Sequence, residues 1–288
     1  MTSSGQRLPI RRTAKLFVGG QFPRSESGRS YEVWSGDGRL LAHAARASRK
    51  DLRDAIVSAR GAFAGWAGRT AYNRGQILYR VAEIMEGRRA QLHDELADAG
   101  APDPAREVDV AIDRWVWYAG WADKIAQVAG GTNPVAGPYF DFTIPEPTGV
   151  VGIVAPSTAP LLGLVSRVAP AIVSGNTVVA IASEPAPLPA VSLAEALATS
   201  DVPGGVINLL TGDPGELVPW LAGHMDVNAI DLSGCAPELV ADAERAAAEN
   251  VKRVHRASTD DVFSAAAQHL SEITAFVEFK TVWHPMGA

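Results

Sequence analysis

Five short apolar runs constrain the fold of this chain more than any other feature of its sequence. They lie at residues 149–155, 176–182, 205–212, 227–234 and 251–255, and a segment with helical periodicity follows each of the first four. Because the runs are continuously apolar and rich in β-branched residues, we expect strands that are buried on both faces. Such strands, alternating with helices, predict an α/β fold with a Rossmann-like, doubly wound parallel sheet.

The first half of the chain changes its periodicity near residue 51. Up to residue 48, short apolar runs alternate with Gly, Ser and Asp turns, which predicts a small antiparallel ribbon or entry arm. From Asp51 onward, apolar residues recur at helical spacing and predict an N-terminal layer of helices. We divide the chain into a ribbon and helical part (1–137), a β-arm (138–149), a Rossmann-like core (150–256), and a helix with a closing strand (257–288).

Composition excludes several classes of function. The net charge is -6 and no basic cluster follows the short start "RLPIRRTAK", so we expect no nucleic-acid surface. No apolar run has the roughly 18 residues of a membrane span, and the first residues lack the apolar core of a signal peptide. One cysteine cannot form an internal disulfide, which favours a cytoplasmic location. The six histidines are scattered without metal-ligand spacing, so no metal ligand is assigned.

The single cysteine, Cys235, lies in "IDLSGCAPELV", where a strand is expected to give way to a helix. Such a thiol can be a nucleophile, part of a cofactor-binding turn, or a packing residue. A helix N-terminus lowers a thiol pKa, which would favour reactivity. A nucleophile also needs an activating partner, however, and the local sequence offers only Glu238. The residues therefore favour the turn or packing over catalysis, and leave those two open.

Five motifs, in order and with matching spacing, resemble the aldehyde dehydrogenase superfamily. They are "EPTGVVGIVAP", "LLGLVSRVAPAIVSGNTVVA", "SEPAPLPAVSLAEAL", "DVPGGVINLLTGD" and "HMDVNAIDLSG", and the resemblance covers about residues 15 to 255. It implies an NAD(P)-binding domain, a catalytic domain with a cysteine nucleophile, and a β-arm that joins subunits.

Two family motifs are altered in ways that matter for chemistry. Where the family has an asparagine that stabilises the oxyanion, this chain has Thr158, in Pro156-Ser157-Thr158, which lacks an amide donor. Where the family has a lysine that binds the adenosine ribose, this chain has Ile181, and only the acidic Glu184 remains.

The glycine-rich cofactor loop of the family is altered as well. It corresponds here to Leu232 through Leu239: Gly234 is kept, Cys235 replaces a serine that approaches the pyrophosphate, and Leu239 replaces the last glycine. Cys235 thus aligns with the cofactor loop and not with the catalytic nucleophile. The cofactor-binding candidates that the resemblance supplies are Glu184, Ser233, Gly234 and Cys235, and it supplies no catalytic residue. We expect no tightly bound cofactor, and at most a weak affinity for NAD(P).

After "NVKRV" the sequence departs from the family altogether. The family continues with a general-base glutamate and a large catalytic domain, whereas this chain continues with "HRASTDDVFSAAAQHL". The segment "ITAFVEFKTVWHPMG" nevertheless resembles the strand that follows the family's catalytic domain and pairs with a neighbouring subunit. This pattern most resembles the degenerate second half of the double-length, family-sixteen aldehyde dehydrogenases.

Two hypotheses of function follow from these departures. In the first, the chain is a non-catalytic subunit that assembles with itself or with a full-length aldehyde dehydrogenase through two protrusions, residues 138–149 and 275–284. Each protrusion would leave unpaired strand edges, and Trp283 would anchor a partner. In the second, it is an NAD(P)-dependent oxidoreductase whose missing residues a partner supplies. A dinucleotide-binding sensor module remains a third alternative.

Overall fold

A five-stranded parallel sheet lies at the centre of the structure, a computed structural model that describes residues 12–256 and 261–287. Its strands lie in the order β10 (Arg253–His255), β9 (Ala229–Asp231), β6 (Val150–Val154), β7 (Thr177–Ile181) and β8 (Ile207–Leu210). Every neighbouring pair is parallel, so the predicted doubly wound α/β sheet is confirmed. The strands are shorter than the apolar runs because the ends of the runs belong to turns.

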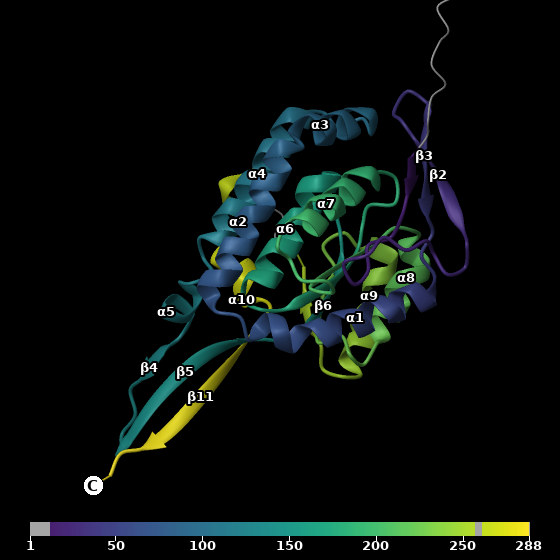
Figure 1. The fold of residues 1–288 in the computed structure, drawn as a ribbon. Helices are drawn as coiled ribbons and strands as arrows, with labels where there is room; N and C mark the ends of the chain where they lie inside the picture. The colour runs from purple at the N-terminus through teal and green to yellow at the C-terminus, as the bar shows by residue number, and fades with distance from the viewer. Residues whose placement is uncertain (1–11, 257–260, 288) are drawn as a thin grey trace, which may run out of the picture.

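Helices cover both faces of this sheet, which explains the continuously apolar strands. Val151 and Ile153 point into one core and Val150 and Val154 into another, because successive side chains of a strand face opposite ways. The first core contains α2 (Ala71–Gly87), α3 (Arg89–Asp98), α4 (Pro104–Ala119), α6 (Pro160–Val173) and α7 (Leu188–Thr199). The second contains α1 (Arg49–Ala67), α8 (Pro214–Gly223) and α9 (Pro237–Ala248), on the opposite side of the sheet in Figure 1.

Local signals in the sequence start several of these helices. Ser48 and Asp51 form a capping box at the start of α1, and Asp103 caps α4 with Pro104 in its first turn. The short helices are α5 (Ile125–Ala129), the 3₁₀ turn η1 (Ala265–Ala267) and α10 (Leu270–Thr274). Within residues 12–256 and 261–287, no helix combines the length and apolar character needed to cross a membrane.

The N-terminal ribbon is antiparallel only in part. β2 (Ser30–Trp34) and β3 (Leu40–Ala45) are antiparallel, as predicted, but β1 (Arg12–Ala14) joins β3 in parallel. Beyond β1, the backbone of Phe17 exchanges two hydrogen bonds with Leu209 of β8, at 2.9 and 2.8 Å. The ribbon is thereby fixed to the edge of the central sheet.

The two expected protrusions form one sheet, which corrects the prediction of separate unpaired edges. β5 (Tyr139–Pro147) and β11 (Val277–Pro285) pair antiparallel along their whole lengths, and β4 (Gly131–Asn133) covers part of the other edge of β5. Figure 1 shows this arm projecting from the body of the molecule, with the C-terminus at its tip. We refer to β4, β5 and β11 together as the arm.

Candidate functional site

The sheet reverses its strand order between β6 and β9, and ligands of doubly wound sheets bind beyond the carboxyl ends of the strands at such a point. The turn after β6 contains Pro156, and the turn after β9 contains Ser233, Gly234 and Cys235. Glu184 follows β7, on the other side of β6. The structure therefore places all four candidate residues at the same edge of the sheet, three of them in one turn.

Gly234 lies where only glycine fits. Its amide donates to the carbonyl of Val154 at 2.9 Å, and a Cβ atom at this position would lie 2.2 Å from the carbonyl carbon of Ala155. The turns after β6 and β9 therefore contact each other through backbone atoms alone. The role of the glycine in this structure is to allow this close contact, since any larger residue would push the two turns apart.

Cys235 lies two residues before the start of α9 and is half-buried. Its amide donates to the carbonyl of Leu232 at 3.0 Å, and its side chain packs beside Leu239 against the core that contains α1, α8 and α9. Burial raises the pKa of the Cys235 thiol, and the negative charge of Glu238 raises it further. A raised pKa keeps the thiol protonated at neutral pH, the opposite of what a nucleophilic cysteine requires.

Ser233 is tied to a buried carboxylate that the sequence motifs did not reveal. Its amide donates to Asp231 Oδ1 at 2.8 Å, and Asp231 is fully buried at the end of β9. Asp231 Oδ2 lies 3.8 Å from Arg167 Nη1 of α6. Burial raises the pKa of Asp231, and the charges of Arg167 and His255 only partly offset this.

Arg167 joins this carboxylate to the C-terminal part of the chain. It forms an ion pair with Glu272 of α10, and His255 Nε2 lies 3.1 Å from Glu272 Oε2. Burial alone would raise the pKa of Glu272, but its contacts with His255 and Arg167 outweigh burial and lower it. We call Arg167, Asp231, His255 and Glu272 the buried ionic cluster.

The ribbon contributes two residues beside Glu184 that no motif indicated. The Tyr31 hydroxyl donates to the backbone carbonyl of Glu184 at 3.2 Å. Arg46 bridges Asp213 at 3.0 Å and Glu216 at 3.2 Å. The pKa of Glu184 is raised by partial burial and by Asp213, and lowered less strongly by Arg46. The sequence alone could not place Arg46 here, because it precedes α1 and lies far along the chain from Glu184.

A buried glutamate occupies the N-terminus of α6. Glu107 of α4 accepts hydrogen bonds from the amides of Leu161 and Leu162, at 2.9 and 3.2 Å, through the same oxygen. Burial raises the pKa of Glu107 despite these bonds. Helix N-termini attract anions, and here the protein supplies its own.

The residues at this edge fit a dinucleotide only in part. The N-cap of α9, Ala236, makes no side-chain hydrogen bond, but the helix begins with Pro237, which has no amide N–H, and the Leu239 amide donates to the Ala236 carbonyl at 2.9 Å, so this helix start offers few backbone donors to a phosphate. The ribose end does not fit, because Ile181 is fully buried in the apolar core and offers no charge. Leu239 likewise packs against this core. We therefore derive no chemical step through a nicotinamide cofactor.

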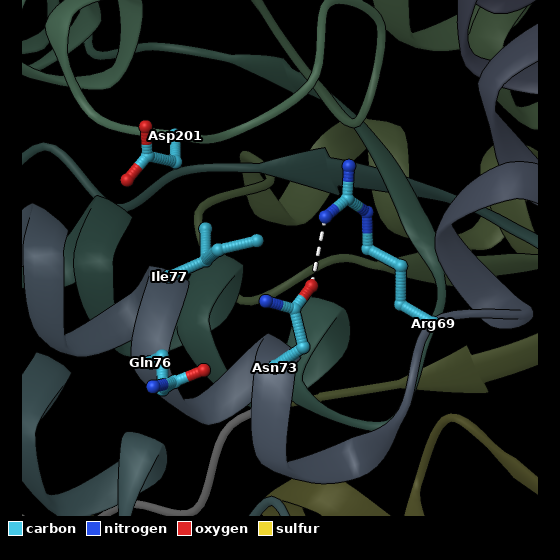
Figure 2. A pocket seen from close by; sticks show the side chains of 5 residues that line it. All are labelled: Arg69, Asn73, Gln76, Ile77 and Asp201. Atoms are coloured by element: carbon cyan, nitrogen blue, oxygen red, sulfur yellow. Dashed lines mark hydrogen bonds between the residues drawn. The ribbon is translucent and has the colours of Figure 1, made fainter.

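A separate cavity of about 530 Å³ lies at the opposite end of the sheet (Figure 2). Arg69, Asn73, Gln76, Ile77 and Asp201 line it, and Arg69 Nη1 donates to Asn73 Oδ1 at 2.7 Å. Asp201 precedes β8, so the cavity lies near the amino ends of the strands, away from the expected cofactor edge.

Comparison with known proteins places the chain in a family. The model of the aldehyde dehydrogenase family matches residues 23–257. Retinal dehydrogenase 2 of Homo sapiens is 35% identical over 262 residues, which are 88% of this chain and 50% of that protein. Aldehyde dehydrogenase, cytosolic 1, of Elephantulus edwardii is 33% identical over 248 residues, 83% of this chain and 49% of that protein.

A solved structure shows the same fold over the same part. The NAD+ complex of aldehyde dehydrogenase from Bacillus cereus matches with a TM-score of 0.80 and 26% identity, covering 85% of this chain and 51% of that one. The chain thus spans about half the length of each of these three relatives. From its sequence motifs, its doubly wound sheet and these similarities, we conclude that the chain belongs to the aldehyde dehydrogenase family.

Proposed function

We propose that the chain is a non-catalytic subunit of the aldehyde dehydrogenase family that oligomerises and assembles with a full-length aldehyde dehydrogenase through its arm. In this proposal it corresponds to the degenerate second half of the double-length enzymes. Its role is to stabilise or orient the catalytic partner.

The arm is the observation that carries this proposal. β11 is an edge strand, and among the described residues nothing pairs with its outer side. Phe279 and Trp283 lie exposed on one face of the arm, and Phe140 and Ile144 on the other, because directly opposed residues of β5 and β11 share a face. A long strand edge flanked by exposed aromatic side chains is an association surface, which natural proteins usually cover.

The chemistry of the cofactor edge supports a non-catalytic role. Its one thiol has a raised pKa and packs against a core, and the turn after β6 carries Thr158 in place of an amide donor. Between β10 and β11 the chain has only residues 256–276, of which the described part packs against α4 and α6. For example, Arg114 of α4 donates to the carbonyls of Val262 and Ala267, at 2.9 and 3.0 Å.

The assembly is tested by mixing the purified chain with a full-length aldehyde dehydrogenase of its own host and measuring mass by light scattering after size exclusion. We expect a stoichiometric complex, which the double variant Phe279→Lys/Trp283→Lys abolishes. Tyr72→Lys is the matched control, since Tyr72 is a similarly exposed aromatic residue on α2. If the chain remains separate from every such enzyme of its host, or if the arm variant still assembles, the proposal is wrong.

A weak dinucleotide-binding role is the second candidate, favoured by the position of Ser233, Gly234 and Glu184 at the carboxyl ends of the strands. Calorimetric titration with NAD+ tests it: the subunit proposal predicts no saturation below millimolar concentration.

Incubation with aldehydes and NAD+ tests the enzyme hypothesis. We expect no change in nicotinamide absorbance from the chain alone. If turnover appears only in the mixture and exceeds that of the partner, the partner supplies the missing residues.

A further inference from the structure

A surface cavity of about 430 Å³ lies between α1 and α8, which are neighbours on one face of the sheet in Figure 1. Its volume falls within the range of small-molecule sites. It is lined by Arg49, Leu52 and Arg53 of α1, by Pro219, Trp220 and Gly223 of α8, and by His224 and Met225 just after α8. None of these residues belongs to the cofactor edge or to the arm.

The central part of the cavity wall is apolar, and contacts with neighbouring residues fix its position. The Arg49 guanidinium carbon lies 3.6 Å from the centroid of the Trp220 ring, a cation–π contact that fixes the indole. Trp220 is 44% exposed and Met225 68% exposed, next to the fully buried Leu52. The Met225 backbone is also fixed, because Asn250 Nδ2 donates to its carbonyl at 3.1 Å. Two large apolar side chains therefore present their surfaces to one hollow.

The charged side chains that line the cavity are all cationic. Among the described residues, Arg49 forms no ion pair, and Arg53 forms only a 3.6 Å pair with Asp54, its neighbour on α1. No carboxylate lines the cavity, although the chain as a whole carries a net charge of -6. The two guanidinium groups are thus left without an acidic partner inside the hollow.

His224 adds a neutral donor. Its Nδ1 accepts a hydrogen bond from the amide of Asp226 at 3.2 Å, so the ring proton lies on Nε2. Partial burial lowers the pKa of His224, which keeps the ring neutral at pH 7. The side-chain hydrogen-bonding groups of the cavity therefore donate and do not accept.

We propose that this cavity binds small-molecule anions that combine an apolar body with one carboxylate or sulfonate. The apolar body lies against Trp220 and Met225, and the anionic group lies at Arg49 and Arg53. This site is independent of the proposed subunit function, because it uses neither the arm nor the cofactor edge.

The test uses a pair of fluorescent probes that differ in charge. The anion 8-anilinonaphthalene-1-sulfonate is titrated against the wild-type chain, and neutral N-phenyl-1-naphthylamine serves as its uncharged counterpart. We expect one sulfonate probe per chain, and binding weakened about fivefold or more by Arg49→Gln and by Arg53→Gln. Lys50→Gln removes the same charge from the same helix outside the cavity, and is expected to change the affinity less than about twofold.

Further measurements distinguish specific anion binding in the cavity from non-specific hydrophobic binding of the probes. Decanoate is expected to displace the sulfonate probe, and decanol is not. Trp220→Leu is expected to weaken both probes, while the circular dichroism spectrum stays unchanged because the indole is half exposed. Equal binding of the neutral probe, or no effect of either arginine substitution, would overturn the proposal. Arginine-dependent binding to phosphatidylserine vesicles would assign the surface to a membrane instead.

Discussion

At the scale of single residues, the surroundings of Cys235 disfavour a nucleophilic thiolate. The thiol packs against a core, and both burial and Glu238 raise its pKa. We predict that iodoacetamide labels Cys235 at pH 7 more slowly than it labels free glutathione, because less thiolate is present. Glu238→Gln removes one cause of the shift and should speed the labelling. Labelling as fast as that of a free thiol would contradict this account.

Lys252 is a buried cation without a carboxylate partner among the described residues. Burial lowers its pKa from 10.5 to about 8, and its ammonium donates to the Asn250 side chain. Because the unfolded chain then binds the proton more tightly, stability should rise with pH between about 8 and 10.5. We predict that Lys252→Met raises the free energy of unfolding by about 1 kcal/mol at pH 7, a value discounted for solvent near the amine.

Urea denaturation at several pH values tests the Lys252 prediction. The advantage of Lys252→Met should shrink as the pH rises from about 8 to 10.5, because the folded lysine loses its proton near the first value and the unfolded lysine near the second. Lys15→Met, which removes an exposed lysine between β1 and α1, is the control and should show no such dependence. A stability gain that stays constant across this range would show that burial of charge is not the cause.

At the scale of elements, glycines mark where backbones meet. A Cβ at Gly234 would collide with the backbone of Ala155, whereas a Cβ at Gly61, inside α1, would meet no atom within 4 Å. We predict that Gly234→Ala lowers the free energy of unfolding by about 3 kcal/mol. Gly61→Ala should raise it by about 0.5 kcal/mol, because alanine is the better helix former. Urea denaturation of both variants tests this, and a neutral Gly234→Ala would refute the contact.

The same scale shows what could be predicted of the candidate site. Motif spacing placed Ser233, Gly234 and Cys235 in one turn, because they are adjacent in sequence and follow a clear apolar run. The Glu107 cap of α6 could not be predicted, because its partners Leu161 and Leu162 follow more than fifty positions later and no local pattern links them. Arg46 beside Glu184 was missed for the same reason.

At the scale of the whole molecule, the buried ionic cluster fastens the C-terminal part to the central sheet. Glu272 precedes β11 and contacts Arg167 of α6 and His255 of β10. We predict that Glu272→Gln lowers the free energy of unfolding by about 2 kcal/mol at pH 7. The reason is that the Arg167 charge stays buried while one of its two neighbouring carboxylates is removed. Glu83→Gln, at an exposed carboxylate of α2, is the control and should change stability little.

The pH dependence distinguishes the charge of Glu272 from its shape. Its pKa is lowered in the folded state, so its contribution is fully present above its ordinary value of 4.5 and is lost as the pH falls below it. The difference between wild type and Glu272→Gln should therefore shrink in acid, as measured by urea denaturation at pH 7 and pH 4. A difference that persists unchanged at pH 4 would assign the effect to packing.

The sequence by itself determined the parallel sheet and the helices on its two faces. Burial of both faces makes each strand continuously apolar, and each helix has its own periodicity, so these elements are encoded locally. Only the tertiary structure decided that β5 and β11 form one arm, that β1 joins β3 in parallel, and that Glu272 meets Arg167. These contacts join residues far apart in the chain, and their energy depends on burial and distance, which no local pattern records.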